Sequence, residues 1–403
     1  MSCSRSFSLS QNTSQPYLIP LLALLAAFPP IATDMYLPAM ELLQNTWQAS
    51  LTGINLTLVL FFTFFSLFLL IYGPLSDRFG RRPILINGIS IYIIGSLLCA
   101  FSTSLNQLIV FRCLQAIGAA SASVVALAIS KDVYQGKKRE QVLAYITMIM
   151  AIAPIVSPMI GAVMVDYMTW PWLFISQALL GGIALYGCIK LKETANQLLL
   201  TSARDVLISY VKLLKNSWFR QHNWMQMCSI LPMFAFIGAS PAIYMDQFEV
   251  SAQMYSLLFA LNAFGLMAGA FVFSKLRNYL APRYLMLIGK IGILLASLAM
   301  FLLADDAVLQ DFVLCMLVIT FSIGVMRPVT NSQALEGVKQ FAGTASAILS
   351  FSTFVGAACA MYLVSLGSVL SPWQWVAVIG MLGGVFSLWC WLMTASAAKQ
   401  YVS

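Results

Sequence analysis

The stretch Gly73-Pro74-Leu75-Ser76-Asp77-Arg78-Phe79-Gly80-Arg81-Arg82-Pro83 lies between two long apolar segments, residues 51–72 and 83–101. It holds one acid, three arginines, two glycines and two prolines in eleven residues. Glycine and proline permit a sharp turn, and the charged side chains need polar partners at a membrane surface. We therefore expect a tight connection between two membrane spans, with the rest of the chain forming spans around such junctions.

The composition excludes an ordinary soluble protein. The 403-residue chain is 60% hydrophobic and only 9% charged, whereas about 25% charged residues is usual for soluble domains. The alternating segments of about ten residues that build a membrane β-barrel do not occur in the sequence. The predicted fold class is therefore an all-α polytopic membrane protein.

Segments of about 20 apolar residues are long enough to cross a bilayer. The sequence predicts twelve of them, at residues 17–40, 51–72, 83–101, 106–130, 141–164, 171–191, 219–245, 252–274, 283–304, 309–334, 342–366 and 373–396. The long polar connection 192–218 divides them into two six-helix bundles, 17–191 and 219–397, flanked by tails 1–16 and 398–403.

The distribution of charge predicts the orientation in the membrane. The net charge is +8, and all but three of the 22 basic residues fall in the connections on one side of the twelve spans. Lys and Arg accumulate in cytoplasmic loops of membrane proteins, so we expect both termini and the 192–218 loop to be cytoplasmic. Because cytoplasmic loops account for the positive charge, the charge does not indicate binding to nucleic acid. We expect membrane lipid as a partner instead.

No constellation typical of an enzyme or metal site occurs in the sequence. Seven of the eight cysteines lie in or beside apolar segments, without the spacing of a metal site. The lone His222 is expected to be interfacial, and no phosphate-binding loop or nucleophile elbow is present. We predict a non-enzymatic protein that has no cofactor or metal.

Ionisable residues within spans are costly and are functional candidates. Asp34 lies in Thr33-Asp34-Met35-Tyr36-Leu37-Pro38 near the outer end of the first span, and Arg112 lies early in the fourth. A pair with Arg112 would keep Asp34 charged, whereas separation would let it take a proton. We predict a proton-coupling or substrate role for Asp34, Arg112 and the neighbouring Tyr36.

Two further cations, Lys290 and Arg327, also fall within spans. Arg327 is close enough to the inner end of its span to extend to the headgroups, and Lys290 can do so only with more strain. Their roles are left open.

The fifth span contains two prolines four residues apart, Pro154 and Pro158, with the small residues Ser157 and Gly161 around them. Such a helix is expected to bend and to allow a neighbouring helix to approach closely.

Together these patterns resemble the major facilitator superfamily, and within it the twelve-span drug:proton antiporters of the Bcr/CflA type. The stretch 73–83 is similar to the superfamily signature between spans two and three. Residues 108–118 resemble its span-four motif, with Ala116 where glycine is frequent. Span five is similar to the antiporter motif, with Ser157 and Ala162 in the places of two glycines. Residues 33–39 and 341–346 resemble spans one and eleven of Bcr/CflA-type exporters.

The resemblance implies two bundles around a central cavity that opens alternately to either side of a bacterial inner membrane. It implies a conformational latch on the inner face formed by Gly73, Asp77, Arg78, Gly80, Arg81 and Arg82. Asp77 and Arg81 would pair in the outward-open state and separate in the inward-open state. It also assigns proton coupling to Arg112, and it predicts a monomer.

The function predicted from these features is export of small, mostly apolar drugs or toxic compounds in exchange for protons. The alternative on the same scaffold is export of one endogenous metabolite, such as a siderophore, nucleoside or amino-acid derivative. A third hypothesis, from another class, is a receptor or assembly subunit that transports nothing.

Overall fold

The computed structural model describes residues 17–195, 203–305, 308–338, 342–366 and 370–400. The predicted tail 1–16 lies outside the described part of the chain, and so do residues 401–403 of the predicted tail 398–403; α14 continues to Gln400. The helices are α1 (Leu18–Asp34), α2 (Met40–Thr46), α3 (Leu51–Phe79), α4 (Arg81–Ala100), α5 (Leu105–Val133), α6 (Gly136–Tyr167), α7 (Pro171–Lys190), α8 (Ala203–Lys215), α9 (Ser217–Pro241), α10 (Ala252–Leu276), α11 (Pro282–Leu302), α12 (Leu309–Glu336), α13 (Ala342–Ser365) and α14 (Pro372–Gln400).

Within the described residues, twelve helical segments are long and apolar enough to cross a membrane. This confirms the predicted twelve spans. The first combines α1, the short 3-10 turn Leu37–Ala39 and α2; the seventh combines α9 with the π-helical turn Ala242–Gln247. The span boundaries extend beyond the predicted ones mainly at the ends that carry charge.

Short polar side chains start several of these helices. The Ser50 hydroxyl accepts a hydrogen bond from Gly53 N at the start of α3, and Asn216 does the same for Phe219 N at the start of α9. Each cap satisfies one of the backbone N–H groups that a first turn leaves without a partner. The caps thus mark where the chain enters the apolar layer.

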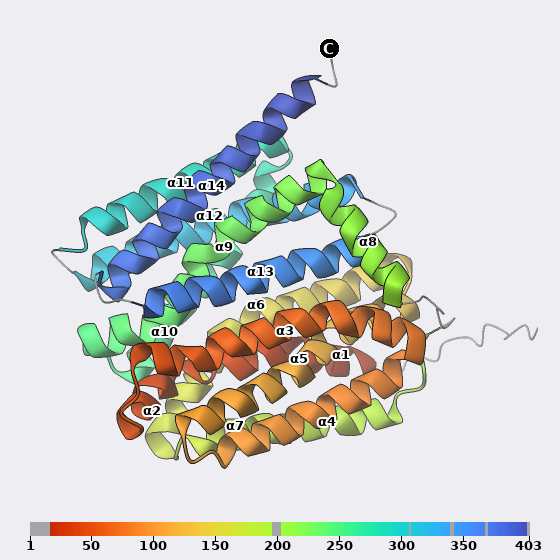
Figure 1. The fold of residues 1–403 in the computed structure, drawn as a ribbon, viewed down its shortest axis with the longest axis vertical. Helices are drawn as coiled ribbons and strands as arrows, with labels where there is room; N and C mark the ends of the chain where they lie inside the picture. Colours follow the sequence, from red (N-terminus) through yellow and green to blue (C-terminus); the bar gives the residue numbers. More distant parts are fainter. Residues whose placement is uncertain (1–16, 196–202, 306–307, 339–341, 367–369, 401–403) are drawn as a thin grey trace, which may run out of the picture.

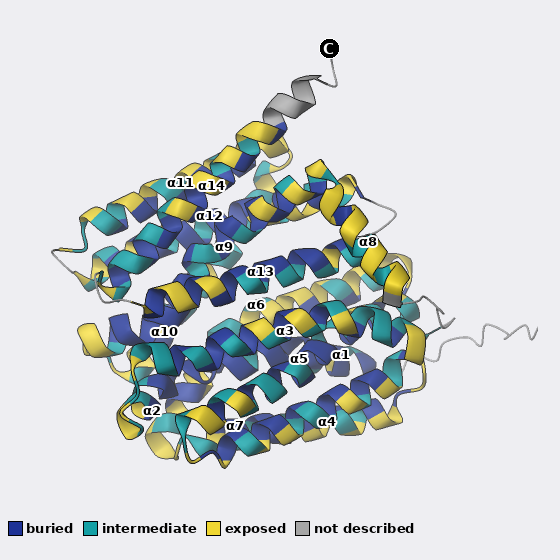
Figure 2. Cartoon of the chain, viewed as in Figure 1, coloured by how far each residue is buried: buried dark blue, intermediate teal, exposed yellow. Residues whose placement is uncertain are grey.

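The spans form two halves (Figure 1). The first half, α1 to α7, lies below the second half, α9 to α14, in that view. The halves meet along two long helix pairs, α3 with α13 and α6 with α10. The burial colouring in Figure 2 shows that helix faces turned outward are exposed and those turned toward neighbouring helices are buried. Exposed apolar residues such as Phe264, Phe271 and Leu295 lie on these outward faces, as expected for contact with lipid.

The connection between α3 and α4 is shorter than the sequence indicated. Both helices continue into the charged stretch, so that Gly80 alone separates Phe79 from Arg81. Gly80 has φ +97°, a backbone angle that suits glycine. Pro74 lies inside α3, and Pro83 lies in the first turn of α4, where proline is tolerated.

The linker between the halves also contains a helix that the sequence analysis did not predict. Helix α8 lies within the expected loop 192–218 and crosses the right-hand end of the molecule in Figure 1. It packs against α9 and α13 of the second half. The linker therefore contributes ordered structure at the end where the 73–83 stretch lies.

Candidate functional site: a cavity between the two halves

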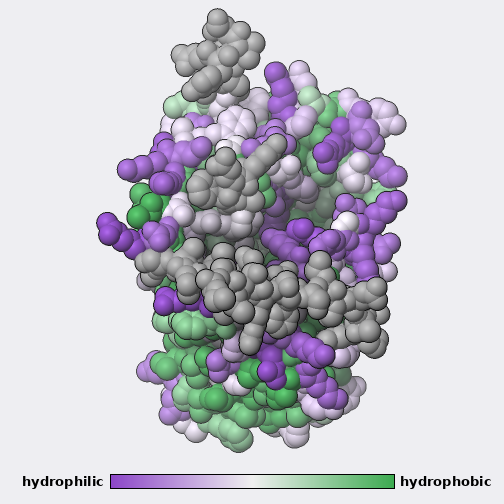
Figure 3. Space-filling model, turned by 90° about the vertical axis from the view of Figure 1, so that its right-hand side faces the viewer, coloured by the Kyte–Doolittle hydropathy of each residue, from purple (hydrophilic) through white to green (hydrophobic). Residues whose placement is uncertain are grey.

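A cavity of about 750 Å³ lies between the two halves. Its deep wall includes Asp34, Phe236 and Asn262, and its mouth includes Asp77 and Tyr210. Because the mouth is bordered by the α3–α4 connection and by α8, the cavity opens at the end that carries the charged stretch. Figure 3 looks onto this end and shows hydrophilic side chains on both halves.

The opposite end of the cavity is closed by contacts between the halves. Thr52 Oγ1 of α3 donates a 2.6 Å hydrogen bond to Ser365 O of α13, and Ser256 Oγ of α10 donates a 3.0 Å hydrogen bond to Pro158 O of α6. Gln253 of α10 also donates to the Asp166 carboxylate of α6. The structure is thus open at one end only.

The proline-containing helix α6 takes part in this closure. Pro158 supplies the carbonyl that Ser256 binds, and Ser157 is buried beside it. A Cβ atom placed on Gly161 would lie 2.2 Å from Met35 O, which shows how closely α6 approaches the end of α1. Pro154 faces the cavity. The close approach expected from the small residues of this helix is therefore present.

Asp34 is the acid in the deep wall of the cavity. It follows two consecutive prolines, Pro29 and Pro30, which lie inside α1 and line the cavity as well. Its side chain is only 6% exposed and accepts a 2.8 Å hydrogen bond from Thr33 Oγ1. Among the described residues, no cation lies within ion-pair distance of the Asp34 carboxylate.

Arg112 is not the ion-pair partner of Asp34 that the sequence suggested as one possibility. It lies inside the first half, fully buried, where Nη1 donates to Ala32 O at 2.8 Å and to Gln115 Oε1 at 2.6 Å. The aromatic rings of Phe61 and Tyr36 lie 4.4 and 5.0 Å from its guanidinium carbon. Cation–π contacts and a backbone carbonyl thus take the place of a carboxylate.

Tyr36 belongs to the surroundings of Arg112 and not to the cavity. It is fully buried, and its hydroxyl accepts a 3.2 Å hydrogen bond from Thr57. Tyr36 is not among the residues that line the cavity, and its contact with a substrate stays a prediction. Its ring, together with that of Phe61, covers the buried Arg112 cation.

Aromatic rings from both halves form part of the cavity wall. Phe62 and Phe65 of α3 meet Phe354 of α13, and the Phe62 and Phe354 rings stack at 5.6 Å with an angle of 7° between their planes. Phe234 of α9 packs edge-on against Phe62 at 5.4 Å. All four rings line the cavity. The amino-acid sequence alone does not reveal this arrangement, because it depends on pairing between the halves.

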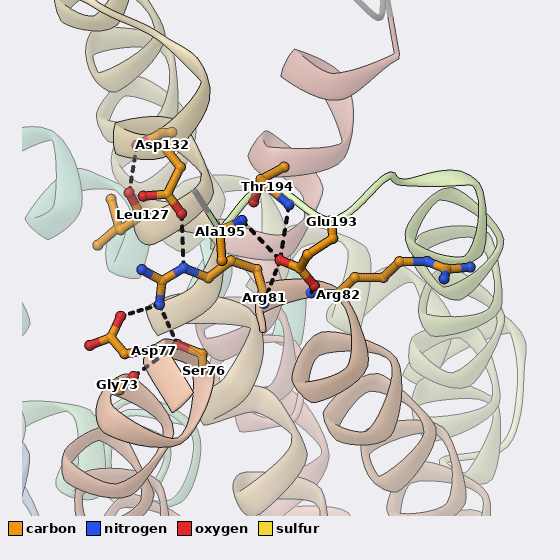
Figure 4. A network of polar contacts seen from close by, with 11 residues as sticks. Gly73, Ser76, Asp77, Arg81, Arg82, Leu127, Asp132, Glu193, Thr194 and Ala195 are labelled. Carbon is orange, nitrogen blue, oxygen red and sulfur yellow. Dashed lines mark hydrogen bonds and ion pairs between the residues drawn. The ribbon is translucent and has the colours of Figure 1, made fainter. Parts of the chain in front are cut away.

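A charged network borders the mouth of the cavity (Figure 4). Arg81 Nη1 lies 2.5 Å from Asp77 Oδ1 and donates a 2.7 Å hydrogen bond to Ser76 Oγ, while Nε donates a 2.9 Å hydrogen bond to Asp132 Oδ2. Asp77 near the end of α3 and Asp132 at the end of α5 thus hold one guanidinium group from two sides. Gly73, also predicted here, lines the cavity one turn before Asp77.

Glu193 is a second member of this region that the sequence analysis did not single out. Its carboxylate accepts hydrogen bonds from Arg81 N at 2.9 Å, Arg82 N at 3.1 Å, Thr194 N at 2.9 Å and Ala195 N at 3.0 Å. Partial burial by itself raises the pKa of the Glu193 carboxyl. The hydrogen bonds from these backbone N–H groups together lower it by more, so the pKa lies below its ordinary value. Glu193 therefore caps α4 with a negative charge.

The remaining arginines of the predicted latch point elsewhere. Arg82 Nη2 donates to Ile189 O at 2.8 Å, and Arg78 lies over the ring of Phe79 at 5.3 Å. The hydrogen-bond partners described above for Arg81 and Arg82 all belong to the first half or to the residues directly after it. The Asp77–Arg81 pair is present in this conformation, whose cavity is open at this end. The two residues are four apart on the chain across one glycine, so opening the halves need not part them.

The other ionisable residues within spans separate into two environments. Arg327 is exposed and lines the cavity from α12. Lys290 is fully buried in the second half, where Nζ donates a 2.6 Å hydrogen bond to Ser387 Oγ. His222, in the second turn of α9, is 1% exposed; its Nδ1 donates to Trp218 O at 2.8 Å and its ring packs on Trp218. Its interfacial position stays a prediction.

Comparison with known sequences relates most of the chain to one family. The sequence model described as Major Facilitator Superfamily matches residues 22–361. The "Uncharacterized MFS-type transporter YdgK" of Bacillus subtilis is 28% identical over 358 residues, which cover 87% of each chain. The "Multidrug resistance protein MdtL" of Klebsiella pneumoniae is 29% identical over 351 residues, covering 87% of this chain and 85% of that protein.

A solved structure supports the fold. A bacterial homologue of the human lysosomal transporter Spinster, in an inward-facing and unoccupied conformation, superposes with a TM-score of 0.74 and covers 98% of each chain at 14% identity. At this identity the likeness concerns the fold alone.

Proposed function

Because this chain belongs to the Major Facilitator Superfamily and is a multi-pass membrane transporter of small molecules, we propose that it exports drugs or other toxic compounds in exchange for protons. The multidrug-resistance names of its MdtL relatives support the substrate class. The sequence resemblance to Bcr/CflA-type antiporters supports the coupling to protons.

The position of Asp34 is the observation that carries this proposal. It is an acid in the deep wall of the cavity, with Thr33 as its hydrogen-bond donor and no cation at ion-pair distance among the described residues. A buried charge without a counterion is costly. A proton or a cationic group of a substrate would each remove that cost, so the two compete for one carboxylate. Competition of this kind is what an exchanger requires.

The rest of the cavity suits a mostly apolar cargo. The rings of Phe62, Phe234 and Phe354 offer apolar surface, and Asn262 is one of few polar side chains in the deep wall. Cavities of several hundred Å³ accommodate drug-sized molecules. A wall of this composition favours molecules recognised by area and shape over molecules that need many hydrogen bonds.

We assign the open mouth to the cytoplasmic side of a bacterial inner membrane. The basic residues of the 73–83 stretch and of α8 lie at this end, and the excess of Lys and Arg in cytoplasmic loops supports the assignment. The conformation is then inward-facing, as in the Spinster homologue. Asp34 would receive substrate from the cytoplasm here and a proton from the other side after the halves rock.

The test is transport by everted membrane vesicles from a bacterial strain that lacks its main efflux pumps. A pH gradient is imposed and reported by a fluorescent weak base. Amphenicols, fluoroquinolones, lipophilic cations and bicyclomycin are then added in turn. We expect wild-type protein to dissipate the gradient with at least one compound, and Asp34→Asn to abolish this response at equal protein level.

Asp311→Asn is the matched control, because it removes a carboxylate at the start of α12 that does not line the cavity. It should leave the response intact. Full activity of Asp34→Asn would refute the role of this residue. No response of the wild type to any compound would refute drug export and favour a dedicated metabolite exporter.

A further inference from the structure

Helix α8 exposes an apolar face that the transport mechanism does not use. Leu207, Val211 and Leu214 are 62%, 45% and 45% exposed, and Ile208 beside them is 41% exposed. Spacings of three and four residues place these side chains on one side of the helix. This face is apolar although α8 belongs to the charged end of the molecule.

The opposite side of α8 packs on the protein and borders the cavity. Leu213 is 2% exposed and packs in a small core with Phe219. Ser209 and Tyr210 line the cavity mouth, and the Tyr210 hydroxyl donates a 2.9 Å hydrogen bond to Leu70 O of α3. The position of α8 is therefore fixed by contacts with both halves, and its apolar face is directed away from them.

Basic residues accompany the exposed apolar face. Lys212 and Lys215 are exposed on α8, and Arg220 follows on the first turn of α9. Only Asn216 separates the end of α8 from α9, which is a membrane span. An amphipathic helix with lysines, joined to a span by one residue, lies where the hydrocarbon layer meets the lipid headgroups.

We propose that α8 binds the surface of an anionic membrane leaflet, with its apolar face inserted between the headgroups and its lysines paired with lipid phosphates. Charge complementarity and the direct continuation into α9 favour lipid over a second copy of this chain, whose α8 would bring the same positive charge. Because Tyr210 and Ser209 border the mouth, the bound leaflet holds one wall of the cavity entrance in place.

Hydrogen–deuterium exchange of the full chain in lipid nanodiscs tests this proposal. Exchange of the α8 amides is compared in discs of phosphatidylcholine alone and in discs that also contain phosphatidylglycerol. A lysine near an anionic surface contributes about fivefold to binding, so we expect α8 to exchange roughly tenfold more slowly, or slower still, in the anionic discs. The difference should shrink at high salt.

Two double variants separate this site from a general effect of charge. Lys212→Gln with Lys215→Gln should remove the lipid dependence. Lys137→Gln with Lys138→Gln, which removes the same charge from exposed residues in the first turn of α6, should keep it. Val211→Ser should speed exchange in both lipids, since it weakens insertion without changing charge.

Several results would overturn the proposal. One is equal α8 exchange of the wild type in the two lipids. Another is protection that rises with the number of protein copies per disc, which would indicate a second copy as the partner. Protection that is unchanged in lipid-free detergent would indicate that the chain itself covers this face.

Discussion

Gly161 offers a sharp test of the packing at the closed end of the cavity. A Cβ atom there would lie 2.2 Å from Met35 O, whereas ordinary contacts begin at 3.4 Å. Alanine at this position therefore requires α6 and the end of α1 to separate by about 1 Å or more. The contact atom belongs to the backbone, so no side-chain rotation can relieve it.

Gly182 in α7 is the matched control, because a Cβ atom there meets nothing within 4 Å. Replacing glycine by alanine inside a helix stabilises it by about 0.5–1 kcal/mol in both variants. This stabilisation is common to Gly161→Ala and Gly182→Ala, so it cancels when the two variants are compared with each other. Overpacking costs typically about 1–3 kcal/mol, so Gly161→Ala should be less stable than Gly182→Ala by about that amount.

The assay is unfolding by sodium dodecyl sulfate in mixed micelles, followed by tryptophan fluorescence, for the wild type and both variants. Transport by the same variants provides a second readout, because Met35 adjoins Asp34 and a shift of α1 moves the carboxylate. We expect Gly161→Ala to lose transport and Gly182→Ala to retain it. Equal unfolding free energies of the two variants would refute the close approach of α6 to α1.

Three further predictions concern the buried and capping charges. Glu193→Gln should destabilise the protein by only about 1 kcal/mol, since the cap is partly exposed. The pKa of Glu193 is lowered from its ordinary 4.5, so its contribution to stability is present at neutral pH and is lost as the pH falls through the lowered pKa. An acid-unfolding curve of the variant identical to that of the wild type would contradict this. Lys290→Met should raise the free energy of unfolding by about 1 kcal/mol or more, because it replaces a buried ammonium group, whose partner is a serine, by an apolar side chain of similar length. A lower unfolding midpoint in the same detergent titration would count against this. Arg112→Lys should lower the free energy of unfolding by about 1–2 kcal/mol, because a lysine cannot reproduce the forked donors of the guanidinium group or its stacking on Phe61. If the variant unfolded thermally at the wild-type temperature, those contacts would contribute little.

The cavity mouth is held together by contacts between residues far apart in the sequence. Glu193 joins the residues after α7 to the N-terminus of α4, and Asp132 joins the end of α5 to Arg81. These links tie three helix ends of the first half into one unit beside the mouth. If the two halves rock as proposed, a linked unit of this kind would move as one body.

Some features followed from the amino-acid sequence alone. The twelve spans could be predicted because a chain in hydrocarbon must satisfy its own backbone hydrogen bonds, so each apolar run of about 20 residues becomes a helix. The functional candidate Asp34 could be named for a related reason, since an acid within a span is too costly to be incidental. The family was indicated by the charged stretch 73–83.

Only the tertiary structure decided which faces these residues occupy. Lipid is as apolar as the space between helices, so hydrophobic periodicity does not reveal whether a side chain faces lipid, the cavity or a neighbouring helix. Asp34 and Arg112 are both charges within spans, yet Asp34 lines the cavity and Arg112 lies inside the first half against Phe61 and Tyr36. Helix α8 is not one of the spans, so its amphipathic periodicity does carry information. The contact of Tyr210 that helps to direct its apolar face outward nevertheless depends on α3, a helix distant in sequence.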